Sequence, residues 1–239
     1  WVRIYPIPFR MLDQESRYKK YQWIELDLVK NTSDSRPESY KPVNYNQIKI
    51  LNEIGTEKGL WTTRRNIILK KVYTNLNILI KEAKNRSIRT SLAVFKPKKI
   101  LDFTYKRTDS EWDKKKLEHL KYKSNQLHLF DAPNKYFDPV KKLPYKFSYK
   151  FIDDENRQAT LMIEDWEICQ LYWKCLKNKK GNEQKALEDV RQKYFEDHAK
   201  TKDLYLFLGT TMVNHYRAPN PFIIIGTFYP KKVDQPGLF

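Results

Sequence analysis

The stretch from Lys146 to Cys175, KFSYKFIDDENRQATLMIEDWEICQLYWKC, constrains the fold more than any other part of the chain. Phe147, Tyr149 and Phe151 alternate with polar residues, which is the period of a half-buried strand. Residues 153–156 are a polar turn, and the apolar run that follows them predicts a second strand. The stretch therefore predicts a strand, a turn and a strand that lead directly into a helix.

Asp165 stands where the N-cap of that helix belongs. Its carboxylate can accept hydrogen bonds from the free backbone N–H groups of the first turn, and Glu167 suits the positive end of the helix dipole. We predict a helix over residues 165–178 that turns an aromatic stripe inward. The residues of this stripe are Trp166, Cys169, Tyr172, Trp173 and Leu176.

The remaining pattern predicts an α+β fold, with one mixed, mostly antiparallel sheet and helices packed mainly on one side. We expect one compact domain in two parts, 1–107 and 108–239. The first part contributes a long helix over 57–86, in which β-branched residues allow a break near Lys71. Its expected strands are 1–5, 21–30, 48–51 and a pair around Pro97 within 91–105. The second part contributes helices at 111–126, 165–178 and 182–202 and strands at 144–151, 204–208 and 221–229.

Charge is the strongest global signal in the chain. The 46 Lys and Arg residues outnumber the 29 Asp and Glu residues, and the formal net charge is +17. Residues 1–107 alone hold 23 of the basic and 10 of the acidic side chains. A field of this sign favours polyanions, with nucleic acid first and an anionic membrane second. Lysine enrichment from an AT-rich genome is the alternative explanation.

The cysteines and the hydropathy pattern favour a cytoplasmic protein. Cys169 and Cys175 face apart on one predicted helix, a spacing that suits neither a disulfide nor a zinc site, so we expect both to be reduced. Neither an apolar run of membrane-spanning length nor a signal peptide is visible, and we expect no membrane partner. Because the chain begins at Trp1, we expect further residues upstream.

Several motifs are spread along almost the whole chain. They are WVRIYPIPFR, RPES at Arg36–Ser39, KLPYKFSYKF, IEDWE, LFLGT and PFIIIG. Together they resemble an uncharacterised prokaryotic protein family whose members often lie near mobile elements. The resemblance implies a bacterial or archaeal origin but no activity. Some members carry Cys and His in the turn before IEDWE, which looks like a small zinc site. Here residues 153–158 hold neither, so the resemblance implies no metal.

Arg3, Arg10 and Arg36 are arginines in a lysine-rich chain. A guanidinium fork can hold a phosphate through two parallel hydrogen bonds, which lysine cannot do. We expect the three to converge on one phosphate-facing surface beside the strand 21–30. An internal ion pair between Arg36 and Glu38 is the alternative.

Further candidates lie in the second part of the chain. Lys146 and Lys150 alternate with aromatic residues that could stack on bases, unless those aromatics form a core face behind a solvated basic face. His215 and Arg217 follow Gly209 in a loop that could hold a phosphate, or that is an ordinary long connection. With two arginines of the long helix added, the predicted nucleic-acid-binding residues are Arg3, Arg10, Arg36, Arg64, Arg65, Lys146, Lys150, His215 and Arg217.

Two acidic groups could support metal-dependent catalysis. Glu25 and Asp27 share one face of the strand 21–30, and Lys30 follows, but it lies one residue too far along for the carboxylate–lysine spacing of a metal-dependent nuclease. The second group is Glu164, Asp165 and Glu167, for which helix capping is the simpler explanation. The four histidines have no ligand spacing, and nucleotide-binding or hydrolase motifs are missing. We therefore predict no catalytic residue, metal or cofactor.

These observations favour a non-catalytic, nucleic-acid-binding subunit of a prokaryotic mobile-element or antiviral-defence assembly. Its expected partners are nucleic acid and other protein subunits. A metal-dependent nuclease is the first alternative. A protein-interaction scaffold whose charge is incidental is the second.

Overall fold

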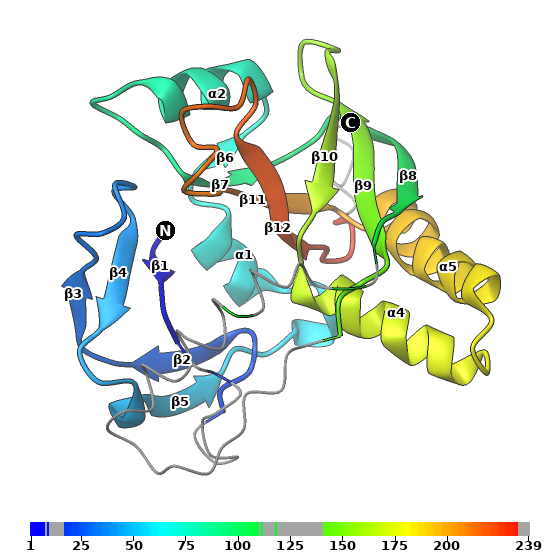
Figure 1. The fold of residues 1–239 in the computed structure, drawn as a ribbon, viewed down its shortest axis with the longest axis horizontal. Helices are drawn as coiled ribbons and strands as arrows, with labels where there is room; N and C mark the ends of the chain where they lie inside the picture. Colours follow the sequence, from blue (N-terminus) through cyan, green and yellow to red (C-terminus); the bar gives the residue numbers. More distant parts are fainter. Residues whose placement is uncertain (8, 10–16, 110, 112–117, 119–140, 234–239) are drawn as a thin grey trace, which may run out of the picture. The chain divides into compact units, whose positions relative to one another are not determined.

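The computed structural model describes residues 1–7, 9, 17–109, 111, 118 and 141–233 (Figure 1). The chain forms two compact units, residues 1–104 with 148–239 and residues 105–147. The strands are β1 Arg3–Ile4, β2 Gln22–Glu25, β3 Leu28–Lys30, β4 Ser39–Pro42, β5 Lys49–Glu53, β6 Val72–Tyr73, β7 Leu92–Phe95, β8 Lys99–Arg107, β9 Tyr145–Ile152, β10 Gln158–Ile163, β11 Tyr205–Thr210 and β12 Phe222–Phe228. The helices are α1 Thr62–Ile68, α2 Leu76–Lys84, α4 Trp166–Asn178 and α5 Glu183–Arg191, with a π-helix at Gln192–Ala199 and 3₁₀ turns at Tyr45–Gln47 and Glu57–Gly59.

A seven-stranded mixed sheet confirms the predicted α+β class. Its strand order is β6-β7-β11-β12-β10-β9-β8. Strand β11 is antiparallel to both β7 and β12, whereas β12 is parallel to β10 and β6 is parallel to β7. The strands on either side of Pro97 do not pair, because β8 forms one edge of the sheet and β7 lies near the other. The expectation of a strand pair around Pro97 is therefore wrong.

The strand, turn, strand and helix predicted from residue 146 onward are confirmed as β9, β10 and α4. Along β9, buried aromatic side chains alternate with exposed or half-buried residues, as the period-two pattern indicates. Asp165 Oδ1 accepts a hydrogen bond from the backbone N–H of Glu167 at 3.0 Å, which makes Asp165 the predicted N-cap. Neither Cys169 nor Cys175 forms a disulfide.

The buried face of α4 differs from the predicted stripe. Trp166 is 52% exposed, and the buried residues of the helix are Ile168, Tyr172 and Cys175. The inward face is therefore centred on Ile168, Tyr172 and Cys175, which follow one another at spacings of four and three residues.

The predicted helix over 57–86 is wrong. Its residues form a 3₁₀ turn, α1, β6 and α2 in succession. Trp61 adopts a left-handed φ of 57° before α1, and Val72 and Tyr73 pair with β7 as a strand. Asn75 then starts a new helix, since its side chain accepts hydrogen bonds from two backbone N–H groups of the first turn of α2. The break falls next to Lys71, where the β-branched residues allow one.

The predicted strand 21–30 is also interrupted, and its two halves join different small sheets. Strand β2 pairs with β5, whereas β3 joins a three-stranded sheet in the order β1-β4-β3. These sheets stand beside the large one in the first unit. The predicted helix 182–202 is present as α5 and the π-helix. Of the predicted helix 111–126, all residues except 111 and 118 lie outside the described residues.

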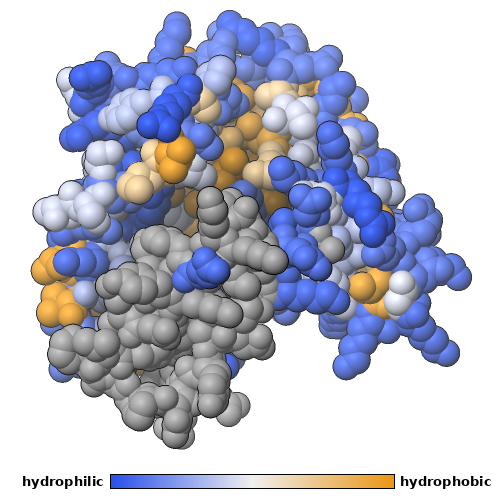
Figure 2. All heavy atoms as spheres, in the orientation of Figure 1, coloured by the Kyte–Doolittle hydropathy of each residue, from blue (hydrophilic) through white to orange (hydrophobic). Residues whose placement is uncertain are grey.

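Figure 2 shows a largely hydrophilic face, with hydrophobic residues gathered in a recess over the centre of the large sheet. Of the helices that the structure describes, none has the length and the apolar character to cross a membrane.

The π-helix carries a histidine into the core. His198 is 3% exposed and stacks on Tyr229, with the ring centroids 3.6 Å apart. Neither ring nitrogen has a hydrogen-bond partner within the described part of the chain. Burial lowers the pKa of His198 to about 3, and the charges of Lys193, Lys202 and Lys20 act in the same direction, against Asp197.

Asp165→Ala should destabilise the protein by about 1 kcal/mol, because it removes the cap of α4. Asp165→Asn should keep most of that stability, since asparagine is an equally good N-cap residue. Urea unfolding of the three proteins at pH 7 measures the difference. An alanine variant as stable as the wild type would show that the cap contributes nothing.

His198 should make the protein sensitive to acid. Because the folded state binds the proton more weakly than the unfolded state, stability should fall as the pH drops below the unfolded pKa of ~6.5, and level off near the folded value. At pH 5 the loss should be about 2 kcal/mol. His198→Phe keeps a ring against Tyr229 and should show a flatter stability profile between pH 7 and pH 5. Parallel profiles for the two proteins would refute this assignment.

Candidate functional site

Arg36 lies in the loop between β3 and β4 and is 8% exposed. Its Nε and Nη2 donate to the carboxylate of Asp34 at 2.8 and 2.6 Å, and its Nη1 donates to the backbone carbonyl of Thr210. Burial alone would raise the pKa of Asp34, but the hydrogen bonds from Arg36 and Ser39 outweigh it and hold the pKa well below its usual range. The loop is therefore held by an internal ion pair, as in the alternative interpretation of Arg36, but the acidic partner is Asp34 and not Glu38.

Arg3 and Glu38 meet at Ser91, the residue before β7. Glu38 accepts hydrogen bonds from the backbone N–H and the hydroxyl of Ser91 at 2.9 and 2.7 Å. Arg3 donates to the hydroxyls of Ser39 and Ser91 at 3.1 and 3.0 Å. The structure thus brings Arg3 and Arg36 together, as expected, but these donors are directed at protein groups. Arg10 lies outside the described residues.

His215 anchors the connection between β11 and β12. It is 1% exposed, and its Nδ1 shares a hydrogen bond with the Thr210 hydroxyl at 2.8 Å. Burial lowers the pKa of His215, and the positive charge of Arg36 has the same effect. The next residue, Tyr216, packs edge-on against the histidine ring, with the centroids 4.5 Å apart, and is 44% exposed. The loop that the sequence singled out therefore places its tyrosine outward and its histidine inward.

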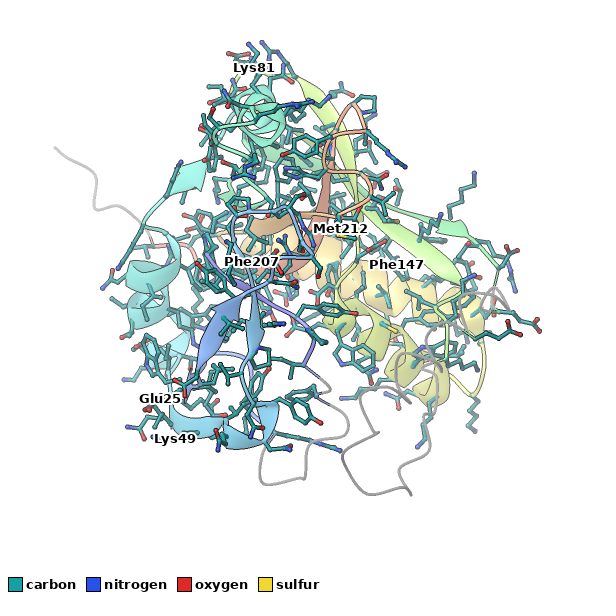
Figure 3. All side chains as sticks on the ribbon, turned by 60° about the vertical axis from the view of Figure 1, so that its left-hand side comes forward. Glu25, Lys49, Lys81, Phe147, Phe207 and Met212 are labelled. Carbon is teal, nitrogen blue, oxygen red and sulfur yellow. The ribbon has the colours of Figure 1, made fainter. Side chains whose placement is uncertain are left out.

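A pocket of about 620 Å³ lies between the end of α2 and this connection, which run side by side (Figures 1 and 3). We call it the basic pocket, and its lining residues are Lys84, Arg86, Arg89 and Tyr216. It brings three cationic side chains and one exposed aromatic ring together, and no acidic residue of the described chain lines it. Mutual repulsion of like charges in such a pocket is relieved when an anion binds.

Arg89 is the most informative residue of the basic pocket. Its Nη1 donates to the carbonyl of Ser35 at 3.3 Å, but its buried Nε has no partner within the described part of the chain. Its backbone is left-handed, with a φ of 54°, a conformation that is unusual for arginine. The Asn85 side chain stabilises this turn by accepting hydrogen bonds from the backbone N–H groups of Ser87 and Ile88. The turn thus holds Arg89 in place while its buried Nε–H donor is without an acceptor.

Arg64 and Arg65, two of the predicted nucleic-acid-binding residues, make their contacts within the protein. Arg64 is 6% exposed, donates to the carbonyl of Ile54 and lies over the ring of Tyr21 at 4.0 Å. Arg65 donates to the carboxylate of Asp203 at 2.7 Å, with a side chain only 18% exposed. Both hold α1 against its surroundings.

The exposed candidates lack aromatic partners on β9. Lys146 and Lys150 are exposed, but Tyr149 and Phe151 are fully buried, so these rings have no face free for a base. The core-face interpretation of this strand is correct. Arg217 is exposed and follows Tyr216 directly.

Of the carboxylates considered for a metal-dependent nuclease, Glu25 and Asp27 line the same pocket, together with Lys49. Glu25 forms an ion pair with Lys49 at 2.9 Å (Figure 3), and Asp27 follows the end of β2. The Lys30 ammonium group donates to the carbonyl of Pro37 and lies 4.6 Å from the Tyr40 ring centroid. Within the described ranges, no three His, Cys, Asp or Glu side chains are grouped so that they could hold a metal ion.

The four residues of the basic pocket were not predicted to lie together. Lys84 and Arg86 fell within the predicted long helix over 57–86, and Arg89 was not singled out. Tyr216 lies between His215 and Arg217 in the loop that was expected to hold a phosphate. The available signal was the basic run KEAKNRSIR at the end of α2, together with a tyrosine between His215 and Arg217. Nothing in either segment shows that they lie side by side.

Asp34→Asn should destabilise the protein by roughly 3 kcal/mol at pH 7, because it leaves the buried guanidinium of Arg36 without its counter-charge. Since the pKa of Asp34 is depressed in the folded state, the stabilisation is present above pH ~4 and is lost as the pH falls further. Thermal unfolding of both proteins at pH 7 and pH 3 should show the difference shrinking in acid. Arg217→Ala, on the exposed connection, is the control and should leave stability unchanged. A difference that stays constant between the two pH values would contradict the pairing.

No curated protein and no solved structure is significantly similar to the chain. Residues 1–70 match the model of a family described as Domain of unknown function (DUF8758). Residues 72–239 match that of Domain of unknown function (DUF8757), and the boundary falls immediately before β6. The second match spans well over half of the chain. The protein therefore belongs to the DUF8757 family, with a DUF8758 segment ahead of that domain.

Proposed function

We propose that the protein binds nucleic acid and that the basic pocket is its contact site. The observation that supports this most is the gathering of three cations around a pocket without acidic lining, one of them Arg89 with an unused buried N–H donor. A phosphate oxygen is the acceptor that a guanidinium group matches best.

The charge of the whole chain supports the same function. A net charge of +17 attracts a polyanion from a distance, and each phosphate neutralised by Lys or Arg releases condensed counterions. The internal arginines do not take part, because Arg36 and Arg65 are paired with Asp34 and Asp203. The contacts are therefore assigned to exposed cations, and Arg217, which is exposed and follows Tyr216 in the chain, is a further member.

The setting that we propose is a prokaryotic mobile-element or antiviral-defence assembly in the cytoplasm, in which the protein is a non-catalytic subunit. The support is the resemblance of the sequence motifs to a family found near mobile elements, together with two cysteines that form no disulfide. Other subunits of the assembly would be its protein partners.

Binding to a fluorescent 20-nucleotide DNA or RNA should weaken steeply between about 50 and 200 mM salt, by orders of magnitude if several phosphates are contacted. Replacing both Lys84 and Arg86 with alanine should raise the dissociation constant about tenfold and reduce the salt slope by about one per lost contact. Both side chains are exposed, so the melting temperature should not change.

The matched control replaces Lys177 and Lys185, two exposed lysines on α4 and α5, and removes the same charge away from the basic pocket (Figure 1). If both double variants weaken binding equally, the charge acts only as a diffuse field and the pocket is not the site. Absence of binding to DNA and RNA at 50 mM salt would refute the proposed function.

A further inference from the structure

We infer that the basic pocket selects single-stranded nucleic acid, with an unpaired base stacked on Tyr216. This inference rests on the proposed function and adds the class of substrate. It follows from three features: an exposed aromatic ring in the wall of the pocket, hydrogen bonds that hold the backbone on either side of that ring, and exposed apolar side chains on the same connection.

The first feature is the position of the Tyr216 ring. It lines the same pocket as Lys84, Arg86 and Arg89, and 44% of the residue is exposed. Cations that contact phosphates beside an aromatic ring that stacks on a base are the two elements of single-strand recognition. In a duplex the faces of the bases are covered by their neighbours, so a ring can reach only their edges or the backbone.

The second feature is that the ring is held in place before any ligand binds. The neighbouring His215 is fixed by its bond to the Thr210 hydroxyl, and its backbone N–H donates to the carbonyl of Thr211 at 3.0 Å. Farther along, the backbone N–H of Ala218 donates to the carbonyl of Asn214 at 3.1 Å. A pre-ordered platform loses little conformational entropy on binding, which favours stacking over a transient contact.

The third feature is the apolar surface of the same connection. Met212 and Val213 are 55% and 62% exposed, and Figure 3 shows Met212 at the loop that follows β11. Exposed apolar side chains gain nothing from phosphates, but they can pack against the faces of unstacked bases.

Fluorescence anisotropy with a labelled 15-nucleotide oligothymidylate, a 15-nucleotide oligouridylate and a blunt 15-base-pair DNA duplex tests the inference. The wild type should bind one or both single strands at least about tenfold more tightly than the duplex at the same salt concentration. Tyr216→Ala should weaken single-strand binding about tenfold with an unchanged salt slope, and Tyr216→Phe should bind like the wild type. Melting temperatures of both variants show whether they are folded at the assay temperature, and Tyr216→Phe should match the wild type because its ring keeps the packing against His215.

The outcomes separate this inference from the proposed function. If the duplex binds as tightly as the single strands and Tyr216→Ala has no effect, while the Lys84 and Arg86 double variant weakens all probes, the single-strand inference is wrong and the proposed function stands. If no probe binds at low salt, the proposed function itself is wrong.

Discussion

The buried ion pair between Arg36 and Asp34 is the constraint on which the arrangement of the first unit depends. Removing two charges from water costs several kcal/mol unless their hydrogen-bonding groups are satisfied. Asp34 therefore accepts from Arg36 and also from the Ser39 hydroxyl at 2.9 Å, while the remaining arm of the guanidinium donates to the Thr210 carbonyl. That last bond joins residues 174 positions apart in the chain and ties the DUF8758 segment to β11.

The same network positions the basic pocket. The backbone carbonyl of Thr210 accepts a hydrogen bond from Arg36, and its hydroxyl shares one with His215. These bonds fix the beginning of the connection that carries Tyr216. On the other side, the loop before Arg36 supplies the Ser35 carbonyl that holds one arm of Arg89. Acidic side chains are used to neutralise internal cations in this region, which leaves the pocket cations without acidic neighbours on its wall. The charge of the site is thus a consequence of how the core is assembled.

Sequence reasoning succeeded where the determining interactions are local. The alternation along β9 and the carboxylate of Asp165 act over a few residues, and both were predicted correctly. The long helix was wrong because periodicity alone cannot weigh a cap at Asn75 and strand pairing of Val72 against helix continuation. The arginines were noticed for their chemistry, but whether Arg36 faces solvent or the core depends on a carbonyl in a strand far along the chain. For the same reason the basic pocket, built from residues near 86 and near 216, could not be assembled from the sequence.

Mapping the bound strand directly tests the central claim, that nucleic acid occupies the basic pocket. Ultraviolet cross-linking of the wild-type protein to a 15-nucleotide oligothymidylate, followed by mass spectrometry of the peptides, identifies the residues in contact with bases. We predict cross-links at Tyr216 or its neighbours on the connection between β11 and β12. We also expect the bound strand to protect Arg86 and Arg89 from chemical modification. Cross-links confined to other elements, such as the exposed face of β9 that carries Lys150, would contradict it.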